Sequence, residues 1–172
     1  MFDQAVQIVL GSAGDALPAD FAQDRGRLYL GPDWAAGLKA AGAALPHLAA
    51  QMRGQMTWLN DVLSDGRAFV LGDAPAALDA QVYYIVWFLR GRWAQGPQFL
   101  SEFPNLTSWE SRVSAIGHGR VSDMSPEAAI EAAMADVTAP EAEDARDPQG
   151  LTPGMIVTVS PDLDGGEQPV TG

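Results

Sequence analysis

The chain has 172 residues, of which 47% are hydrophobic and 19% are charged, as is typical of one globular domain, with or without a small appendage. Its formal net charge of −12 disfavours nucleic acids and anionic membrane surfaces as partners, because both select basic surfaces. The absence of cysteine excludes a disulfide framework, a thiolate zinc site and a cysteine nucleophile.

The N-terminal half predicts helices. The first spans residues 2–12 and carries apolar residues at helical spacing, namely Phe2, Val6 and Val9. Pro18 is a suitable start for a short second helix. The following stretch of small residues gives no clear element. From Pro46 a regular apolar face predicts a long helix, through Leu48, Met52, Met56, Leu59 and Leu63.

Residues 77–93 predict the central helix of a bundle. One apolar row steps by three and four residues through Leu78, Val82, Val86, Leu89 and Trp93. Tyr83 and Trp87 add a second row, and a helix that is apolar on so much of its circumference is usually buried on several sides. A further helix follows from Pro104, and another is expected with Ser125 as its N-cap and Pro126 at its first position.

Composition changes after residue 137. Eight of the 22 acidic residues but one of the ten basic ones lie from Asp136 onward. We therefore expect a helical domain over residues 1–137, an acidic linker over 138–149, and a short strand and turn extension over 150–172. The extension contains one predicted strand, residues 154–159. Its edges must dock on the domain, pair with another chain, or remain disordered.

Asp79 stands out as one acid at the head of an apolar helix. In a capping box, the residue three positions after the N-cap returns a hydrogen bond to the backbone N–H of the N-cap. With Ala76 as the N-cap, Asp79 occupies that position, and its charge favours the positive end of the helix. We therefore interpret Asp79 as a structural cap rather than a catalytic group.

Two motifs carry a resemblance to a known family. In "GDAPAALD", Gly72, Pro75 and Asp79 stand where glutathione transferases place the start of their central helix. "FPNLTSWESRVSAIG" is similar to the helix that follows in that family, through Phe103, Pro104, Leu106, Trp109 and Arg112. Residues 1–135 therefore resemble the all-helical C-terminal domain of glutathione transferases, which implies an all-α bundle. The end of the chain resembles the start of a β extension found in some bacterial relatives.

The chain departs from this family pattern in two ways. Ala76 replaces the usual capping serine or threonine. No segment corresponds to the thioredoxin-like domain, which in the family precedes the helical domain, binds glutathione and activates its thiol. The resemblance therefore places no catalytic residue on this chain and implies glutathione only as the family's co-substrate. We expect either a fragment or a truncated gene.

Five residues are candidates for an apolar substrate wall. The resemblance favours Phe2, Val6 and Val9 on the first helix, and Tyr83 and Trp87 could line a pocket on the central helix. Ordinary core packing is the competing interpretation for all five. No metal site is expected. His47 and His118 have no convergent partners in the sequence, and Asp162, Asp164 and Glu167 lack the regular glycine of a calcium loop.

Three functions remain open. The chain could be the substrate-side part of a glutathione transferase-like enzyme, with thiol transfer only when a thioredoxin-like domain is supplied. It could be a non-catalytic binding or protein-interaction module, with a surface that self-associates into a homo-oligomer. It could also be a relic without a function of its own. Since the N-terminus has no signal-peptide pattern, we expect a cytoplasmic protein.

Overall fold

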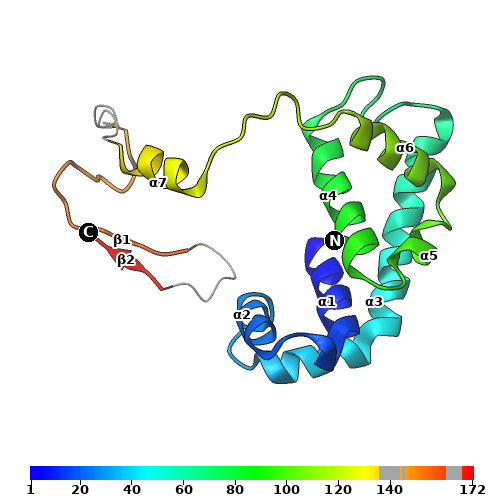
Figure 1. Cartoon of the computed structure of the whole chain (residues 1–172), viewed down its shortest axis with the longest axis horizontal. Coiled ribbons are helices and arrows are strands. Elements are labelled where there is room, and N and C mark those ends of the chain that lie inside the picture. Colours follow the sequence, from blue (N-terminus) through cyan, green and yellow to red (C-terminus); the bar gives the residue numbers. More distant parts are fainter. Residues whose placement is uncertain (136–143, 145, 162–167) are drawn as a thin grey trace. The chain divides into compact units, whose positions relative to one another are not determined.

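The computed structural model of the chain describes residues 1–135, 144, 146–161 and 168–172. It contains two compact units, and the boundary between them follows Gly117. Helices α1 to α6 belong to the first unit, and α7 with a small sheet belongs to the second (Figure 1). The predicted fold class, an all-α bundle with a short C-terminal β extension, is confirmed. The domain limits set at residues 137 and 149 stay a prediction.

The first unit begins with three helices. Helix α1 spans Phe2–Ala13 and continues into a 3-10 turn, η1, at Gly14–Ala16. Helix α2 spans Ala19–Leu30 and starts directly after Pro18, as expected. Helix α3 spans Trp34–Val62, so it begins well before Pro46, where the clear apolar pattern starts. The intervening residues are rich in alanine, the best helix former, and Pro46 removes only one backbone hydrogen bond from this long helix.

Three further helices complete the first unit. A 3-10 turn, η2, at Leu63–Asp65 leads into a loop, and α4 follows at Ala77–Arg92. The short α5 spans Gly96–Leu100 and α6 spans Pro104–Ala115. Helix α4 packs against α1, α5 and α6 (Figure 1). Its core-facing row is buried at Val82, Val86 and Leu89, but Leu78, expected in the same row, is 37% exposed.

The opposite side of α4 is more open than its apolar sequence predicts. Tyr84 and Trp87 are each 47% exposed, so α4 is buried against α1, α5 and α6 but its second apolar row is only partly covered. Both rings take part in aromatic contacts along the surface of the first unit, which shield much of their area without enclosing them.

The hydrophobic core lies among α1, α3, α4, α5 and α6. Its largest fully buried side chains include Ile8 of α1, Met52 and Met56 of α3, Leu89 of α4, and Trp109 of α6. The methionines fit the irregular space between helices because their side chains are unbranched and flexible.

A glycine sets how closely α1 approaches α3. A Cβ atom on Gly11 would lie 2.7 Å from the backbone carbonyl carbon of Ala41 and 2.8 Å from the backbone nitrogen of Gly42. No side chain fits there. Gly11 therefore permits backbone contact between the two helices, and this contact fixes the position of the face of α1 that carries Val6 and Val9.

Helix α6 receives its N-terminal cap from another helix. Its own N-cap residue, Phe103, provides no side-chain acceptor. Instead, Asn60 of α3 places its side-chain oxygen 3.0 Å from the backbone nitrogen of Asn105 and 3.4 Å from that of Leu106. The Asn105 side chain donates in return to the Asn60 carbonyl oxygen at 3.2 Å. This pair joins α3 to α6 and satisfies two of the otherwise unpaired N–H groups of α6.

The second unit contains α7, at Pro126–Met134, capped by Ser125 as predicted: its hydroxyl accepts from the backbone nitrogen of Ala128 at 3.1 Å. The apolar residues Ile130 and Met134 are 61% and 81% exposed. Their spacing of four residues predicts an apolar face that continues to Val137, which lies outside the described residues.

The expectation of a lone strand over residues 154–159 is wrong. Strand β1 is confined to Thr158–Val159 and pairs antiparallel with β2 at Val170–Thr171. Thr158 faces Thr171, and their hydroxyl oxygens lie 2.9 Å apart. The partner strand is therefore supplied by the chain itself. It was missed because the turn-rich terminal segment contains only two strand residues.

Among the described helices, none combines the length and the apolarity that crossing a bilayer requires.

Candidate functional site

The carboxylate of Asp79 organises the start of α4. Its Oδ2 accepts a hydrogen bond from the backbone nitrogen of Ala76, the N-cap residue, at 2.9 Å. Its Oδ1 accepts from the backbone nitrogen of Val70 at 2.9 Å and from the indole nitrogen of Trp109 at 2.8 Å. One side chain thus connects the loop before α4, the helix itself, and α6. The reciprocal bond of a capping box is absent, since Ala76 has no side-chain acceptor.

Asp79 is only 1% exposed, so its charge requires compensation. Burial of the carboxyl group raises the pKa of Asp79, but the hydrogen bonds from Val70, Trp109 and Ala76 lower it, and the net pKa lies below the usual value. The group is therefore ionised and fully engaged at neutral pH. Those properties suit a structural acceptor rather than a proton-transfer group.

Two arginine side chains hold the same loop through its carbonyl groups. The Arg112 Nε donates to the carbonyl oxygen of Ala68 at 2.9 Å, and the Arg67 side chain donates to the carbonyl oxygen of Val70 at 3.1 Å. The segment before α4 is thereby fixed at both its amide and its carbonyl groups. Arg112 makes the kind of structural contact that an arginine at a helix end is expected to make.

An apolar cavity of about 420 Å³ lies among α1, α2 and α4, and we call it the α1–α2–α4 cavity. Helix α1 contributes aliphatic residues and one ring, and α2 and α4 contribute most of the aromatic ones. The lining residues include Phe2, Val6, Val9, Phe21, Tyr29, Tyr84 and Phe88. Its volume and composition match those of small-molecule sites in proteins.

The aromatic wall of this cavity is continuous across three helices. The Phe2 ring lies edge-on to Tyr29, with centroids 6.1 Å apart, and is stacked with Tyr84 at 5.9 Å. Tyr84 is also stacked with Phe88 at 6.2 Å and with Trp87 at 6.1 Å. These offset contacts give the wall a defined geometry.

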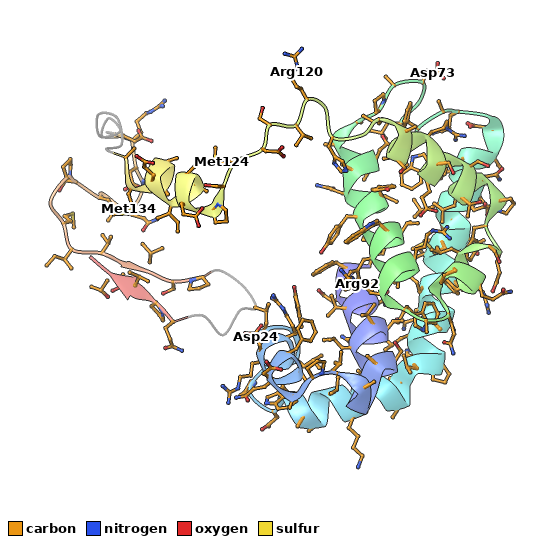
Figure 2. All side chains as sticks on the ribbon, in the orientation of Figure 1. Asp24, Asp73, Arg92, Arg120, Met124 and Met134 are labelled. Carbon is orange, nitrogen blue, oxygen red and sulfur yellow. The ribbon has the colours of Figure 1, made fainter. Side chains whose placement is uncertain are left out.

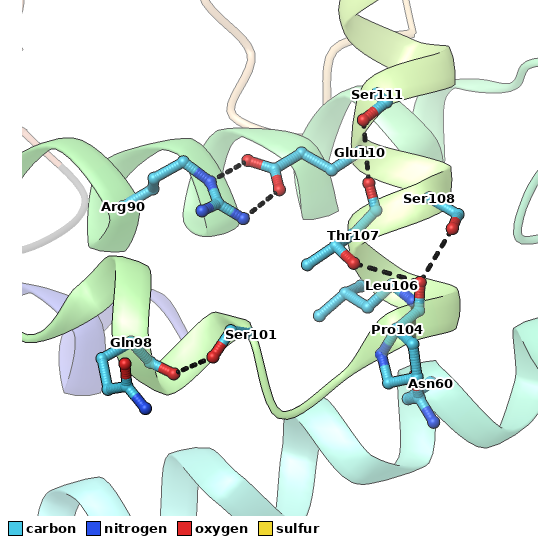
Figure 3. Close-up of polar contacts among 10 residues, drawn as sticks. All are labelled: Asn60, Arg90, Gln98, Ser101, Pro104, Leu106, Thr107, Ser108, Glu110 and Ser111. Atoms are coloured by element: carbon cyan, nitrogen blue, oxygen red, sulfur yellow. Dashed lines mark hydrogen bonds and ion pairs between the residues drawn. The ribbon is translucent and has the colours of Figure 1, made fainter.

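A second hollow runs between α4 and α6, and we call it the α4–α6 groove. It encloses about 850 Å³, is wider and more polar, and is lined by Tyr83 and Trp87 together with hydroxyl-bearing residues of the α6 region. Figure 3 shows its central contact, in which Arg90 holds Glu110 in a two-pronged ion pair, with Nε–Oε1 2.7 Å and Nη2–Oε2 2.5 Å. The paired carboxylate raises the pKa of Arg90 above its already high value.

The hydroxyl groups of the α4–α6 groove donate to nearby backbone carbonyls. Ser101 donates to Gln98 at 2.6 Å, Thr107 to Pro104 at 3.1 Å, and Ser111 to Thr107 at 3.0 Å (Figure 3). Their oxygens can still accept hydrogen bonds, and the guanidinium of Arg90 is occupied by Glu110. The groove therefore offers acceptors and an aromatic surface, without a reactive nucleophile and base pair.

The five predicted wall residues fall in two places. Phe2, Val6 and Val9 line the α1–α2–α4 cavity, whereas Tyr83 and Trp87 line the α4–α6 groove. The structure thus does not bring the whole set together. Their role in substrate binding stays a prediction.

Sequence reasoning missed the α4 side of the cavity. Tyr84 and Phe88, which were not among the predicted residues, line it together with Arg92, one of the arginines that the sequence offers for an anion, and the spacing of four residues places all three on one helical face. That spacing was a usable signal. It was overlooked because the row through Val82 and Val86 dominates the pattern of this helix.

No cluster of three or more histidine, aspartate or glutamate side chains suited to a metal ion occurs within the residues that the structure describes. The exposed His47 lies 2.8 Å from the side-chain nitrogen of Gln51, and His118 is exposed in a loop. The weak calcium-loop candidate, Asp162, Asp164 and Glu167, lies outside the described residues.

Comparison with known proteins gives one family. The family described as glutathione S-transferase, C-terminal domain, matches residues 20–112, which is more than half of the 172-residue chain. No curated protein matches the sequence significantly. The matched region runs from α2 through most of α6 and includes Asp79 and Trp109. The chain therefore belongs to the glutathione S-transferase C-terminal domain family.

Proposed function

We propose that the helical unit is the substrate-side domain of a glutathione transferase-like protein and that the α1–α2–α4 cavity receives an apolar small molecule. The observation that carries this proposal is the cavity itself, which has a size suited to a small ligand and a nearly continuous apolar lining. Phe2, Val6 and Val9, expected on the wall from the resemblance, lie in it together.

Thiol transfer requires more than this cavity. Attack by glutathione on an electrophile needs a thiol whose pKa is lowered by a donor beside the sulfur. In this family the donor and the glutathione site belong to a thioredoxin-like domain. We therefore propose that conjugation occurs only when such a domain is supplied as a partner, with glutathione as the co-substrate.

Binding and chemistry can be tested separately. Titration with a neutral dye such as N-phenyl-1-naphthylamine reports occupancy of the cavity through fluorescence. Val9→Phe adds volume at the wall and should lower the affinity, whereas Val62→Phe makes the same change at a 41% exposed position of α3 outside it. Equal affinity of both variants and the parent chain would place the dye elsewhere.

The proposed need for a thioredoxin-like domain is tested by incubating the chain with glutathione and a chloronitrobenzene. We expect no conjugation above the uncatalysed rate from the chain alone. Turnover by the chain alone would contradict the need for a second domain.

The second candidate is a non-catalytic binding or protein-interaction module. The half-exposed rings of Tyr84 and Trp87, together with Trp58 at 71% exposure, favour it, because exposed aromatic residues are enriched at protein interfaces. A homo-oligomer is the simplest such assembly. Light scattering tests it: a monomer at all concentrations, with no co-purifying partner, contradicts this candidate.

The net charge of −12 makes nucleic acid and anionic membranes unsuitable partners for either candidate function.

A further inference from the structure

We propose that the ligand of the α1–α2–α4 cavity is an aromatic or otherwise flat apolar molecule that ends in a carboxylate or a similar anionic group, which Arg25 and Arg92 bind. This inference rests on the proposed function, since it names the chemical class that the same cavity takes.

The charges on the cavity wall carry the argument. Among the side chains that the structure describes, which do not include that of Asp15, Arg25 and Arg92 are the two charged ones that line the cavity, and no acidic one does. The whole chain contains 22 acidic and only ten basic residues. A wall whose described side chains include two arginines and no acid therefore runs against the composition of the protein, and it is complementary to an anion.

Arg92 is suited to meet a ligand. It lies in the last turn of α4 (Figure 2), and its side chain is exposed. Among the described residues, its guanidinium forms no ion pair with a carboxylate. Arg90, two residues earlier, is already engaged by Glu110. Of the two arginines in this turn, the one beside the cavity is thus the one that retains its donors, and a guanidinium matches a carboxylate with two parallel hydrogen bonds.

Arg25 reaches the cavity from α2. Its guanidinium lies 5.9 Å from the centre of the Phe21 ring, which also lines the cavity. Its Nε is 3.4 Å from Asp24, but the two side chains are 45% and 72% exposed. Such an exposed pair between neighbours in sequence is weak, so Asp24 competes little with a ligand for the terminal nitrogens of Arg25.

The rest of the wall selects the body of the ligand. The stacked rings of Phe2, Tyr84 and Phe88 present flat faces, and Val6 and Val9 add aliphatic groups to the lining. A planar apolar body fits between such surfaces. A bare inorganic anion would leave these apolar surfaces uncovered, and an uncharged apolar molecule would not engage the two guanidinium groups.

Two probes of one shape, 2-naphthylacetate and the neutral 2-naphthylacetamide, separate charge from apolar fit. Calorimetric titration of the full chain should show tighter binding of the carboxylate, with an affinity that falls as salt is added. Arg92→Gln and Arg25→Gln should each weaken carboxylate binding about fivefold and leave amide binding unchanged. Arg120→Gln removes the same charge from an exposed loop outside the cavity (Figure 2) and should change neither.

The outcomes distinguish this inference from the proposed function. Equal binding of both probes, unaffected by either arginine variant, overturns the anionic ligand and leaves the apolar cavity in place. Equal loss of carboxylate binding in Arg120→Gln also overturns it, because the effect would then be one of net charge. Binding of neither probe contradicts the proposed function as well. Circular dichroism of each variant checks that the fold is retained. Arg92→Lys serves as the control variant that preserves the charge.

Discussion

At the scale of single residues, Asp79 does more than cap a helix. Its three hydrogen bonds join Val70 in the loop before α4, Ala76 at the N-cap of α4, and Trp109 in α6. Each bond to a buried charged acceptor stabilises a fold by about 1.5–3 kcal/mol, but the desolvation of the carboxylate offsets part of the sum. The net effect is a junction that is strong only while all its members are present.

Asp79→Asn tests this junction with little change in volume. The amide oxygen can still accept from Val70 and Trp109, but its NH₂ group then faces the N–H of Ala76, and two donors oppose each other. We expect the free energy of unfolding to fall by about 2–3 kcal/mol, measured by urea denaturation. Asp73→Asn, an exposed change in the same loop (Figure 2), should stay within about 0.5 kcal/mol of the parent. Equal stabilities of the two variants would contradict the junction.

The pH dependence of stability follows from the same group. The pKa of Asp79 in the folded chain lies below its ordinary value, whereas the pKa of an aspartate in an unfolded chain is about 3.9. Its stabilising effect is therefore fully present above the unfolded pKa and is lost as the pH falls through the folded one. Urea denaturation from pH 7 to pH 2 should show the stability gap between the parent and Asp79→Asn becoming smaller.

The exposed Asp65 serves as a comparison for that series. Its hydrogen bonds with Arg67 lower the pKa of Asp65 to about 2, so both carboxyl groups have a lowered pKa, but solvent and salt screen Asp65. Added salt should reduce the contribution of Asp65 and spare that of Asp79. A gap between the parent and Asp79→Asn that stays constant with pH would show that the carboxylate is not the group that titrates.

At the scale of elements, close contact between α1 and α3 positions one wall of the cavity. Gly11→Ala should push these helices apart, because the new Cβ atom would meet the backbone of Ala41 at 2.7 Å. We expect a loss of about 1–3 kcal/mol, although alanine is the better helix former. Gly54→Ala lies in α3 with no neighbour within 4 Å and should gain up to about 1 kcal/mol. Thermal unfolding of both variants gives the sign directly, and a stabilised Gly11→Ala would contradict the close packing.

The cap that α3 provides for α6 gives a second test at this scale. Asn60→Ala removes the acceptor for the N–H groups of Asn105 and Leu106 and should cost about 1 kcal/mol, as for other lost caps. Asn60→Asp keeps an acceptor, and its charge suits the helix N-terminus, so it should retain most of the stability. Urea midpoints of the two variants, measured at pH 7, should therefore differ. Equal midpoints would mean that solvent replaces Asn60.

These elements show which features the sequence could reveal. The start of α4 was predictable because Pro75, Ala76 and Asp79 act within a few residues of one another. The cap from Asn60 was not, since the two partners lie 45 residues apart and neither sits in a local pattern. The cavity was half predictable. Its α1 wall follows helical spacing, but whether Trp87 faces the core or the surface depends on which neighbours α4 meets.

At the scale of the whole molecule, the hydrophobic core is confined to the first unit. Every residue of the buried cluster in the described chain lies between Ala5 and Trp109, before the boundary at Gly117. Helix α7 has no buried residue, and both strands are exposed. Burial of apolar area is the main source of stability, so the two units should contribute very unequally to it.

A chain that ends after Arg120 tests this inequality. It keeps the full core and both hollows, and it removes α7 and the sheet. We expect its urea midpoint and its free energy of unfolding to match those of the 172-residue chain within about 0.5 kcal/mol, and its affinity for the neutral naphthyl amide to be unchanged. Tryptophan fluorescence can follow both transitions, because all five tryptophans of the sequence precede residue 120. A loss of several kcal/mol, or a new dependence of the midpoint on protein concentration, would mean that the C-terminal unit covers apolar surface of the first unit, either in the same chain or in a second copy.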